Sequence, residues 1–332
     1  MDLWARRKCC FVARSFRRMS MSLEIKNLWK CYGDRTVVDH ISFSLKEPGV
    51  FALLGRNGAG KTTTIRMILG MLAKDGGEVL WNGRPIEEAN IRIGYLAEER
   101  GLYPKYTLMD QLLYFAALKG VSKSDAQKRI RYWAGRLEVE EYLYPMHRGR
   151  RAPSKIADQL SKGNQQKIQL MAALLADPEF IILDEPLSGL DPVNADLFKS
   201  IIREELEKDK YLIMSSHQME VIEEFCEDIL ILNRGQAVLS GNLNEIKRSY
   251  GRVHMIVKCE GDIHPLVEKM GLKSLYQTPD GDTIQVNDEA QAAAFLRELM
   301  AQGISIVRYE LREPSLHELF VEKTGGMIHG EK

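Results

Sequence analysis

The residues best suited to chemistry form a glycine-rich loop that ends in a lysine and a threonine. Residues 55–62 read Gly-Arg-Asn-Gly-Ala-Gly-Lys-Thr and match the pattern G-x-x-x-x-G-K-[ST]. Glycine lets the backbone wrap closely enough for its N–H groups to surround phosphate oxygens. In such a loop the lysine reaches the terminal phosphates of a nucleotide, and the hydroxyl can ligate Mg²⁺. The predicted nucleotide-binding residues of this segment are Gly55, Arg56, Asn57, Gly58, Ala59, Gly60, Lys61, Thr62 and Thr63.

Two acidic residues follow an apolar run farther along the chain. Residues 180–183 are apolar and lead directly into Asp184 and Glu185. A carboxylate at the end of a strand can hold Mg²⁺, either directly or through water. The next side chain points in a different direction and can polarise an attacking water. With the glycine-rich loop, this pair predicts phosphoryl transfer from a nucleotide to water, with catalysis mainly by positioning and charge stabilisation.

Buried strands and helices must present these residues at one edge of a sheet. Residues 50–54 are a short, continuously apolar run before the loop, and a helix is expected from about residue 61 to residue 69. Residues 212–214 have the same character as a buried central strand. Residues 107–145 have apolar side chains at helical spacing. The sequence therefore predicts an α/β fold in which the loop joins a central strand to a helix.

A third motif opens another predicted helix. Residues 160–166 read Leu-Ser-Lys-Gly-Asn-Gln-Gln, and Ser161 can cap the helix that follows. The segment resembles the signature of the ABC ATPase family, L-S-G-G-Q in most members, with Lys162 and Asn164 as departures. Capping and signature roles can hold together. The resemblance covers roughly residues 23–250 and implies a P-loop NTPase core with a helical subdomain at about 101–160.

The resemblance implies roles for several further residues. Tyr32 is similar to the aromatic residue that stacks on adenine, and a plain core tyrosine is the alternative. His217 is similar to the switch histidine that contacts the γ-phosphate. In this family Ser161 and Gly163 of a second subunit close over the γ-phosphate, and Asp191 reaches across the dimer. The expected ligands are therefore ATP and Mg²⁺, bound between two nucleotide-binding subunits.

One position departs from the common pattern of the family. Glu98 ends the segment Gly-Tyr-Leu-Ala-Glu, where many members have glutamine. An ionised carboxylate accepts hydrogen bonds but cannot donate them, and it adds negative charge near the metal. The predicted catalytic residues are Glu185, His217 and Lys61. The predicted metal ligands are Thr62, Asp184 and Glu98, and Glu98 is also expected to contact the nucleotide.

The character of the sequence changes after residue 250. Residues 251–325 have the order β-α-β-β-α-β, which predicts a small α+β, ferredoxin-like domain. A last helix is expected from Ser315, with Glu318 completing a capping box. Residues 313–320 resemble a C-terminal module appended to some exporter ATPases. We expect a nucleotide-binding domain at 21–250 and an accessory domain at 251–325, which could stabilise, dimerise or sense a ligand.

Composition limits the possible partners. The chain has 46 basic and 46 acidic side chains among 332 residues. Residues 1–20 hold six basic side chains and one acidic, so the rest has no basic excess and no nucleic-acid partner is expected. We expect this N-terminal segment to be a disordered tail or a mis-assigned start, with a targeting segment as the alternative. The five cysteines have the spacing of neither a zinc site nor a disulfide framework.

A membrane pore has to come from another chain. No apolar run approaches the roughly 18–20 residues that span a bilayer. The resemblance implies the ATP-hydrolysing subunit of an ABC transporter, of exporter type, working with a second nucleotide-binding subunit in a homodimer or heterodimer. A separate transmembrane permease would hold it at the cytoplasmic, inner face of the cell membrane. The alternative is a soluble non-transport ABC ATPase, and sodium, drugs and peptides all remain open as cargo.

Overall fold

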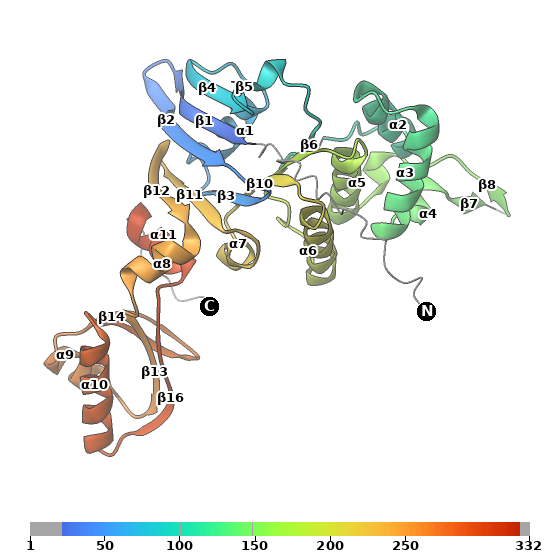
Figure 1. Cartoon of the computed structure of the whole chain (residues 1–332). Helices are drawn as coiled ribbons and strands as arrows, with labels where there is room; N and C mark the ends of the chain where they lie inside the picture. The colour runs from blue at the N-terminus through green and yellow to red at the C-terminus, as the bar shows by residue number, and fades with distance from the viewer. Residues whose placement is uncertain (1–21, 100, 148, 326–332) are drawn as a thin grey trace, which may run out of the picture.

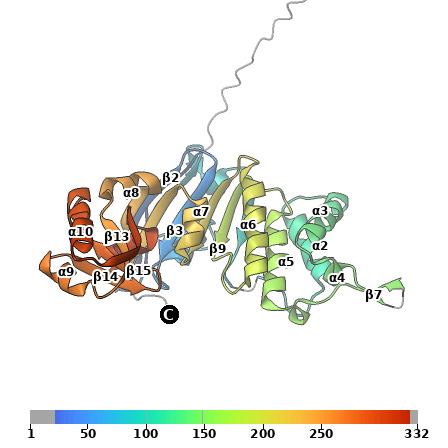
Figure 2. The same ribbon diagram turned by 90° about the horizontal axis from the view of Figure 1, so that it is seen from below.

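The computed structural model describes residues 22–325, apart from residues 100 and 148 (Figure 1). The N-terminal segment at 1–20, expected to be a tail or a mis-assigned start, lies outside the described residues. Seen from below, the small C-terminal domain and the helical subdomain lie at opposite ends of the molecule, with the central sheet between them (Figure 2).

The central sheet has six strands in the order β12-β11-β3-β10-β9-β6. Only β12 runs antiparallel to its neighbour; the other pairs are parallel. Parallel strands place the loops after β3, β9 and β10 at one edge of the sheet, where ligands of such folds bind. The strands are β3 (Gly49–Gly55), β6 (Ile93–Leu96), β9 (Phe180–Asp184), β10 (Tyr211–Ser216), β11 (Asp228–Asn233) and β12 (Gln236–Asn242).

Alternate residues of the central strands face two separate cores. Phe51 and Leu53 pack with α1 (Lys61–Ile68) and with an antiparallel sheet. Ala52 and Leu54 face the opposite core, which contains the buried side chains of the helices described below. Because both faces are covered, these strands are apolar at nearly every position. The antiparallel sheet contains β1 (Leu23–Tyr32), β2 (Arg35–Leu45), β4 (Gly76–Trp81) and β5 (Arg84–Pro85), and is followed by the short 3-10 turn η1 (Ile86–Glu88).

The helical subdomain lies between β6 and β9. The run expected to be helical at 107–145 divides into three helices, because the backbone turns to positive φ at Gly120 and Glu138. A two-stranded hairpin that the sequence did not predict projects beyond them (Figure 2). The elements are α2 (Leu108–Leu118), α3 (Lys123–Arg136), α4 (Glu140–Leu143), β7 (Met146–His147), β8 (Arg150–Arg151), η2 (Ala157–Gln159) and α5 (Lys162–Leu174).

Three more helices follow the strands of the central sheet. They are α6 (Pro192–Leu206), α7 (Met219–Phe225) and α8 (Leu243–Tyr250). Phe198 of α6 and Ile222 of α7 are fully buried in the core that also holds Ile168 of α5. None of the helices in the described part of the chain is long and apolar enough to cross a membrane.

The C-terminal domain has the predicted ferredoxin-like topology. Its antiparallel sheet has the order β14-β15-β13-β16, so the first strand lies in the interior between the third and fourth. Met255, Ile284 and Phe295 are fully buried in its own apolar core. Its elements are β13 (His254–Glu260), α9 (His264–Lys269), β14 (Lys273–Thr278), β15 (Gly281–Gln285), α10 (Glu289–Ala301) and β16 (Ser305–Arg312).

The last helix, α11 (Leu316–Thr324), leaves this domain and returns to the nucleotide-binding domain. Leu316 and Phe320 belong to the same buried cluster as Ile222 of α7 and Leu243 of α8. The expected capping box between Ser315 and Glu318 is present. The segment 251–325 therefore contains one helix whose apolar face completes the core of the preceding domain.

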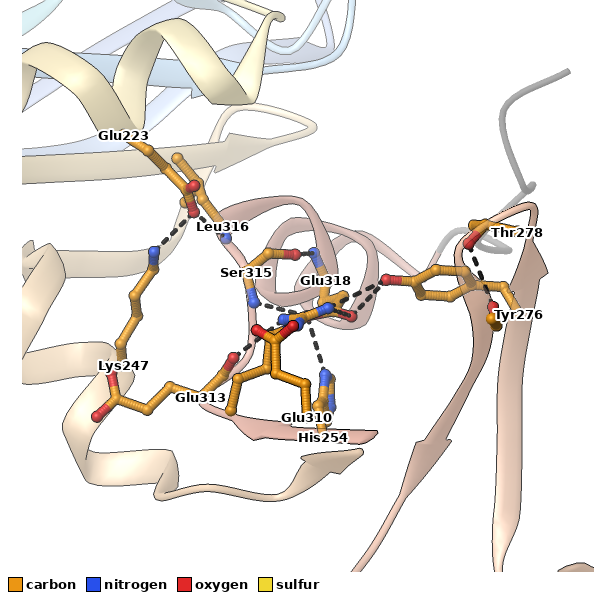
Figure 3. A network of polar contacts seen from close by, with 12 residues as sticks. Glu223, Lys247, His254, Tyr276, Thr278, Glu310, Glu313, Ser315, Leu316 and Glu318 are labelled. Carbon is orange, nitrogen blue, oxygen red and sulfur yellow. Dashed lines mark hydrogen bonds and ion pairs between the residues drawn. The ribbon is translucent and has the colours of Figure 1, made fainter. Parts of the chain in front are cut away.

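Glu318 joins α11 to the small sheet (Figure 3). Its carboxylate accepts two hydrogen bonds from Arg312, both 2.8 Å long, and one from the Tyr276 hydroxyl at 2.6 Å. Nδ1 of His254 lies 2.9 Å from Oε2, an ion-pair distance without good hydrogen-bond alignment. Burial alone would raise the pKa of Glu318, but these contacts outweigh it and hold the pKa well below its usual range. The carboxylate is thus an ionised anchor between strand and helix.

A chain truncated after Tyr250 is expected to bind Mg-ATP, because every nucleotide motif precedes that residue. Its stability should fall, since removing α11 uncovers apolar surface around Ile222 and Leu243. Nucleotide binding and thermal unfolding of the truncated chain test both points. A folded truncated chain that cannot bind ATP would show that the tail completes the site.

A second variant serves as the matched control for this truncation. Lys247 in α8 and Leu316 in α11 both contact Oε1 of Glu223, so the two helices are neighbours. A Gly/Ser linker of about ten residues could therefore replace 252–313 and keep α11 in place. We expect this variant to recover most of the thermal stability that the truncated chain loses.

Candidate nucleotide site

The glycine-rich loop between β3 and α1 surrounds a cavity of about 390 Å³. The backbone is in the left-handed region at Gly58 (φ 78°) and Gly60 (φ 108°), which favours glycine. A Cβ atom on Gly60 would lie only 2.7 Å from the carbonyl oxygen of Val37. These glycines therefore allow the tight curl of the loop. The lining residues are Arg35, Val37, Arg56, Asn57, Gly58, Gly60, Lys61, Thr62, Thr63 and Glu98.

Lys61 lies at the start of α1 and is almost completely buried. Its Nζ donates a hydrogen bond to the carbonyl oxygen of Gly55 at 2.7 Å and lies 3.4 Å from Oε1 of Glu185. The first turn of α1 has no acidic residue, so its positive end faces the loop without compensation. The lysine and the helix terminus together favour an anion in the cavity. Ala59 is a buried residue of the loop and does not line the cavity.

Asp184 and Glu185 are both buried, and their side chains contact different residues. Asp184 is the last residue of β9, whereas Glu185 has a positive φ of 51°, which is uncommon for residues other than glycine. Oδ2 of Asp184 and Oε1 of Glu185 have no hydrogen-bond partner among the described residues. Buried polar atoms normally have partners, so two free carboxylate oxygens mark a site for a ligand or water.

Ser215 and His217 hold this acidic pair in place. Ser215 lies beside Asp184 in the pairing of β10 with β9, and its hydroxyl donates to Oδ1 of Asp184. The same hydroxyl accepts the backbone N–H of Glu185 at 3.0 Å. Nδ1 of His217 lies 2.8 Å from Oε2 of Glu185, which leaves Oε1 as the free oxygen. This arrangement leaves Oε1 of Glu185 able to accept a hydrogen bond from a water or a ligand.

The acidic charge at the site fits a bound divalent cation. Burial raises the pKa of Asp184, although hydrogen bonds from Ser215 and Thr62 act to lower it. Desolvation, followed by the charges of Asp184 and Glu185, raises the pKa of Glu98. The Thr62 hydroxyl and the free Oδ2 of Asp184 are ligands of the kind that Mg²⁺ prefers. No three acidic, histidine or cysteine side chains converge on a metal position in the described residues, so phosphates and water would complete the shell.

The structure does not bring the remaining predicted residues into this cavity. Ser161 caps α5, accepting the N–H of Asn164 at 3.3 Å, and Gly163 follows it in the first turn. Asp191 caps α6 in the same way, and its bond from the Asn194 N–H lowers the pKa of its carboxyl. Tyr32 ends β1 and is 54% exposed, which argues against the alternative of a core tyrosine.

Sequence reasoning missed Arg35, Val37 and Ser215. Arg35 and Val37 reach the cavity because β2 folds back on β1, with Arg35 paired to Tyr32. The turn residues Gly33 and Asp34 directly follow Tyr32, the predicted adenine contact. They could have indicated that the next strand folds back toward the same site. Ser215 could have been found as a polar residue at the end of a buried strand, two positions before His217.

The Glu98→Gln variant is expected to bind ATP about fivefold more tightly when Mg²⁺ is absent, since one negative charge near the phosphates disappears. Salt should weaken this difference, because Glu98 is exposed and its charge is screened. The Mg²⁺ concentration for half-maximal hydrolysis should rise if Glu98 helps to hold the metal. Titrations in EDTA and in Mg²⁺ test both effects.

Glu99→Gln is the control, because the Glu99 side chain is 84% exposed. Equal behaviour of both variants would exclude a role for Glu98.

The fold and this site define a P-loop ATPase, and comparisons with known proteins identify the family to which it belongs. Residues 38–188 match the family model described as ABC transporter. Residues 241–324 match the C-terminal domain of DrrA1-3-like ATP-binding proteins. A solved structure titled as the ATP binding subunit of an ABC transporter is 28% identical, with a TM-score of 0.61, over 69% of this chain and 93% of that chain.

Relatives match over nearly their whole length. The ABC transporter ATP-binding protein YhaQ of Bacillus subtilis is 42% identical over 92% of this chain and 99% of its own. The linearmycin resistance ATP-binding protein LnrL of the same organism is 31% identical over 91% of this chain and 98% of its own. The Nod factor export ATP-binding protein I of Rhizobium etli is 30% identical over 94% of this chain and 96% of its own.

The chain therefore belongs to the ATP-binding proteins of ABC transporters. It is an ATP-binding and ATP-hydrolysing subunit, and the family works with a transmembrane partner. The relatives above are transporter proteins, which disfavours the alternative of a non-transport ATPase. The expected family and fold are confirmed, whereas the residue roles stay predictions.

Proposed function

We propose that this subunit couples hydrolysis of Mg-ATP to export through a separate permease, from the inner face of the cell membrane. The observation that carries the proposal is the contact of buried Glu185 with buried Lys61 and with the exposed His217, beside an open cavity of about 390 Å³. The direction of transport is supported by relatives named for export and for resistance.

In the proposed reaction, each residue of the cluster has one task. Lys61 binds the β- and γ-phosphate oxygens, while Thr62 and Asp184 would hold Mg²⁺. The metal would neutralise phosphate charge. Oε1 of Glu185 accepts the hydrogen bond, and then the proton, of a water that attacks the γ-phosphorus. The bond from this phosphorus to the ADP oxygen breaks, and His217 keeps Glu185 oriented through Oε2.

A second subunit is proposed to close the site. Ser161 and Gly163 lie at the exposed start of α5 and are absent from the cavity lining. The N–H groups in the first turn of a helix favour an anion. A second copy or a related subunit would thus bring Ser161 and Gly163 over the γ-phosphate, with Asp191 at the same interface. ATP would join the two subunits until hydrolysis separates them.

Mixing two inactive variants tests this composite site. Ser161→Arg blocks the surface offered to the partner, and Lys61→Ala disables the phosphate loop. Each heterodimer should contain one intact site, made from the Lys61 side of one subunit and the Ser161 side of the other. The mixture should hydrolyse ATP several-fold faster than either variant alone. Proven heterodimers without any rescue would contradict the two-subunit arrangement.

The permease is proposed to contact the helical subdomain. Tyr103, Tyr106 and Tyr114 are each at least half exposed and line a mainly apolar hollow of about 360 Å³. The residues that line this hollow begin five positions after Glu98 in the chain. Glu98 itself lines the nucleotide cavity. A permease segment seated in the hollow would sense changes at the site through this short segment of the chain.

A further inference from the structure

The short helix after His217 is anchored by one carboxylate. Helix α7 begins at Met219, two residues after His217, and Glu223 lies in its second turn. Oε1 of Glu223 accepts the backbone N–H of Leu316 at 2.6 Å and a hydrogen bond from Nζ of Lys247 at 2.7 Å (Figure 3). A single oxygen atom thus joins α7 to both α8 and α11.

The bond to Leu316 is a helix cap supplied by another element. Leu316 is the first residue of α11, so its N–H has no acceptor within the helix. Ser315 and Glu318 satisfy two other N–H groups through the capping box. An anion at this end of a helix is favourable, and a charged acceptor strengthens the hydrogen bond. Glu223 therefore completes the cap and fixes α7 against the start of α11.

Helix α11 is itself firmly held. Its apolar residues Leu316 and Phe320 are buried in the nucleotide-binding domain, and Glu318 binds Arg312 and Tyr276 of the small sheet. A seven-residue helix is only about 10 Å long, so a shift at one end of α7 also moves the other end. The contact between His217 and Glu185, 2.8 Å long, depends on where α7 begins.

We propose that Glu223 is a positioning residue for ATP hydrolysis, because it ties α7 to α11 and so holds His217 against Glu185. Glu223 does not line the nucleotide cavity and has no contact with the reacting groups. The C-terminal segment thereby takes part in turnover without touching ATP. This proposal rests on the proposed role of His217.

The Glu223→Ala variant should lower kcat by about 2- to 30-fold, the range seen when coupling through packed elements is disturbed. The Kd for ATP should stay unchanged, since the phosphate loop is intact. Glu223→Gln keeps an oxygen that accepts the Leu316 N–H, so it should recover most of kcat. The control is Glu220→Gln, because Glu220 is exposed on the same helix and has no polar partner among the described residues. Thermal unfolding of each full-length variant shows that it is folded.

A double-variant cycle shows whether Glu223 acts through His217. In a His217→Ala background, adding Glu223→Ala should change kcat by less than about 1.5-fold, since the group being positioned is gone. The same fold-loss in both backgrounds would overturn the proposal, as would a normal kcat in the single Glu223→Ala variant. If His217→Ala alone retains full kcat, the role of His217 fails first, and this proposal fails with it.

Discussion

The Glu185→Gln variant should bind Mg-ATP with near-normal affinity and lose turnover by about 10²- to 10⁴-fold, the contribution of a positioned base. Glu185 is only 5% exposed, and its free Oε1 lies 3.4 Å from Lys61 at the edge of the cavity. Glutamine has nearly the same shape and can still contact His217. It cannot take a proton from water, so binding and hydrolysis should separate.

Phosphate release at saturating ATP, together with nucleotide binding at equilibrium, measures these two effects. Glu179→Gln is a matched control, because Glu179 lies just before the other end of β9 and pairs with Arg92 on the surface. We expect the control to stay within about twofold of the unmodified protein. Near-normal hydrolysis by Glu185→Gln would remove Glu185 from the catalytic role and leave the base unassigned.

The Lys61→Ala variant should weaken ATP binding by about 10- to 150-fold, which corresponds to one charge-assisted hydrogen bond of 1.5–3 kcal/mol. Hydrolysis should become undetectable, since the same ammonium group stabilises the leaving and transferred phosphates. Lys61 is buried beside Glu185, so its removal also leaves that carboxylate without its lysine partner. Calorimetric titration with ATP gives the affinity directly.

A lysine outside the site provides the comparison for this variant. Lys74 forms an ion pair with Glu87 at 2.8 Å, and neither residue lines the nucleotide cavity. Lys74→Ala should therefore leave ATP affinity and turnover unchanged. An unchanged affinity and rate in Lys61→Ala would refute the assignment of the phosphate loop.

The parts of the site that are contiguous in sequence could be predicted well. The loop at 55–62 contains its own donors and glycines, and the apolar strand before it shows how it is presented. The same holds for the β-α-β-β-α-β order of the C-terminal domain, where Val253, Met255 and Val257 alternate and turn residues separate the next two strands. Local pattern was sufficient because these features depend on neighbours along the chain.

Features that depend on distant pairing could not be predicted. Ser215 meets Asp184 only because β10 lies next to β9, and Arg35 reaches the cavity only through the β1–β2 hairpin. The capping box of α11 was visible, whereas its docking on α7 was not, because an apolar stripe does not say which surface it covers. Ser161 and Asp191 stay predictions, since both lie outside the cavity of this chain and their proposed contact is with ATP bound to a second subunit.

The mass of Glu185→Gln in solution tests the central claim most directly, because slow hydrolysis preserves bound ATP. Light scattering should show a monomer without nucleotide and with ADP, and a dimer with Mg-ATP. Adding Ser161→Arg to the same chain should abolish the ATP-dependent dimer while leaving the phosphate loop intact. A Glu185→Gln chain that is saturated with Mg-ATP and remains monomeric would contradict the proposal that ATP joins two of these subunits.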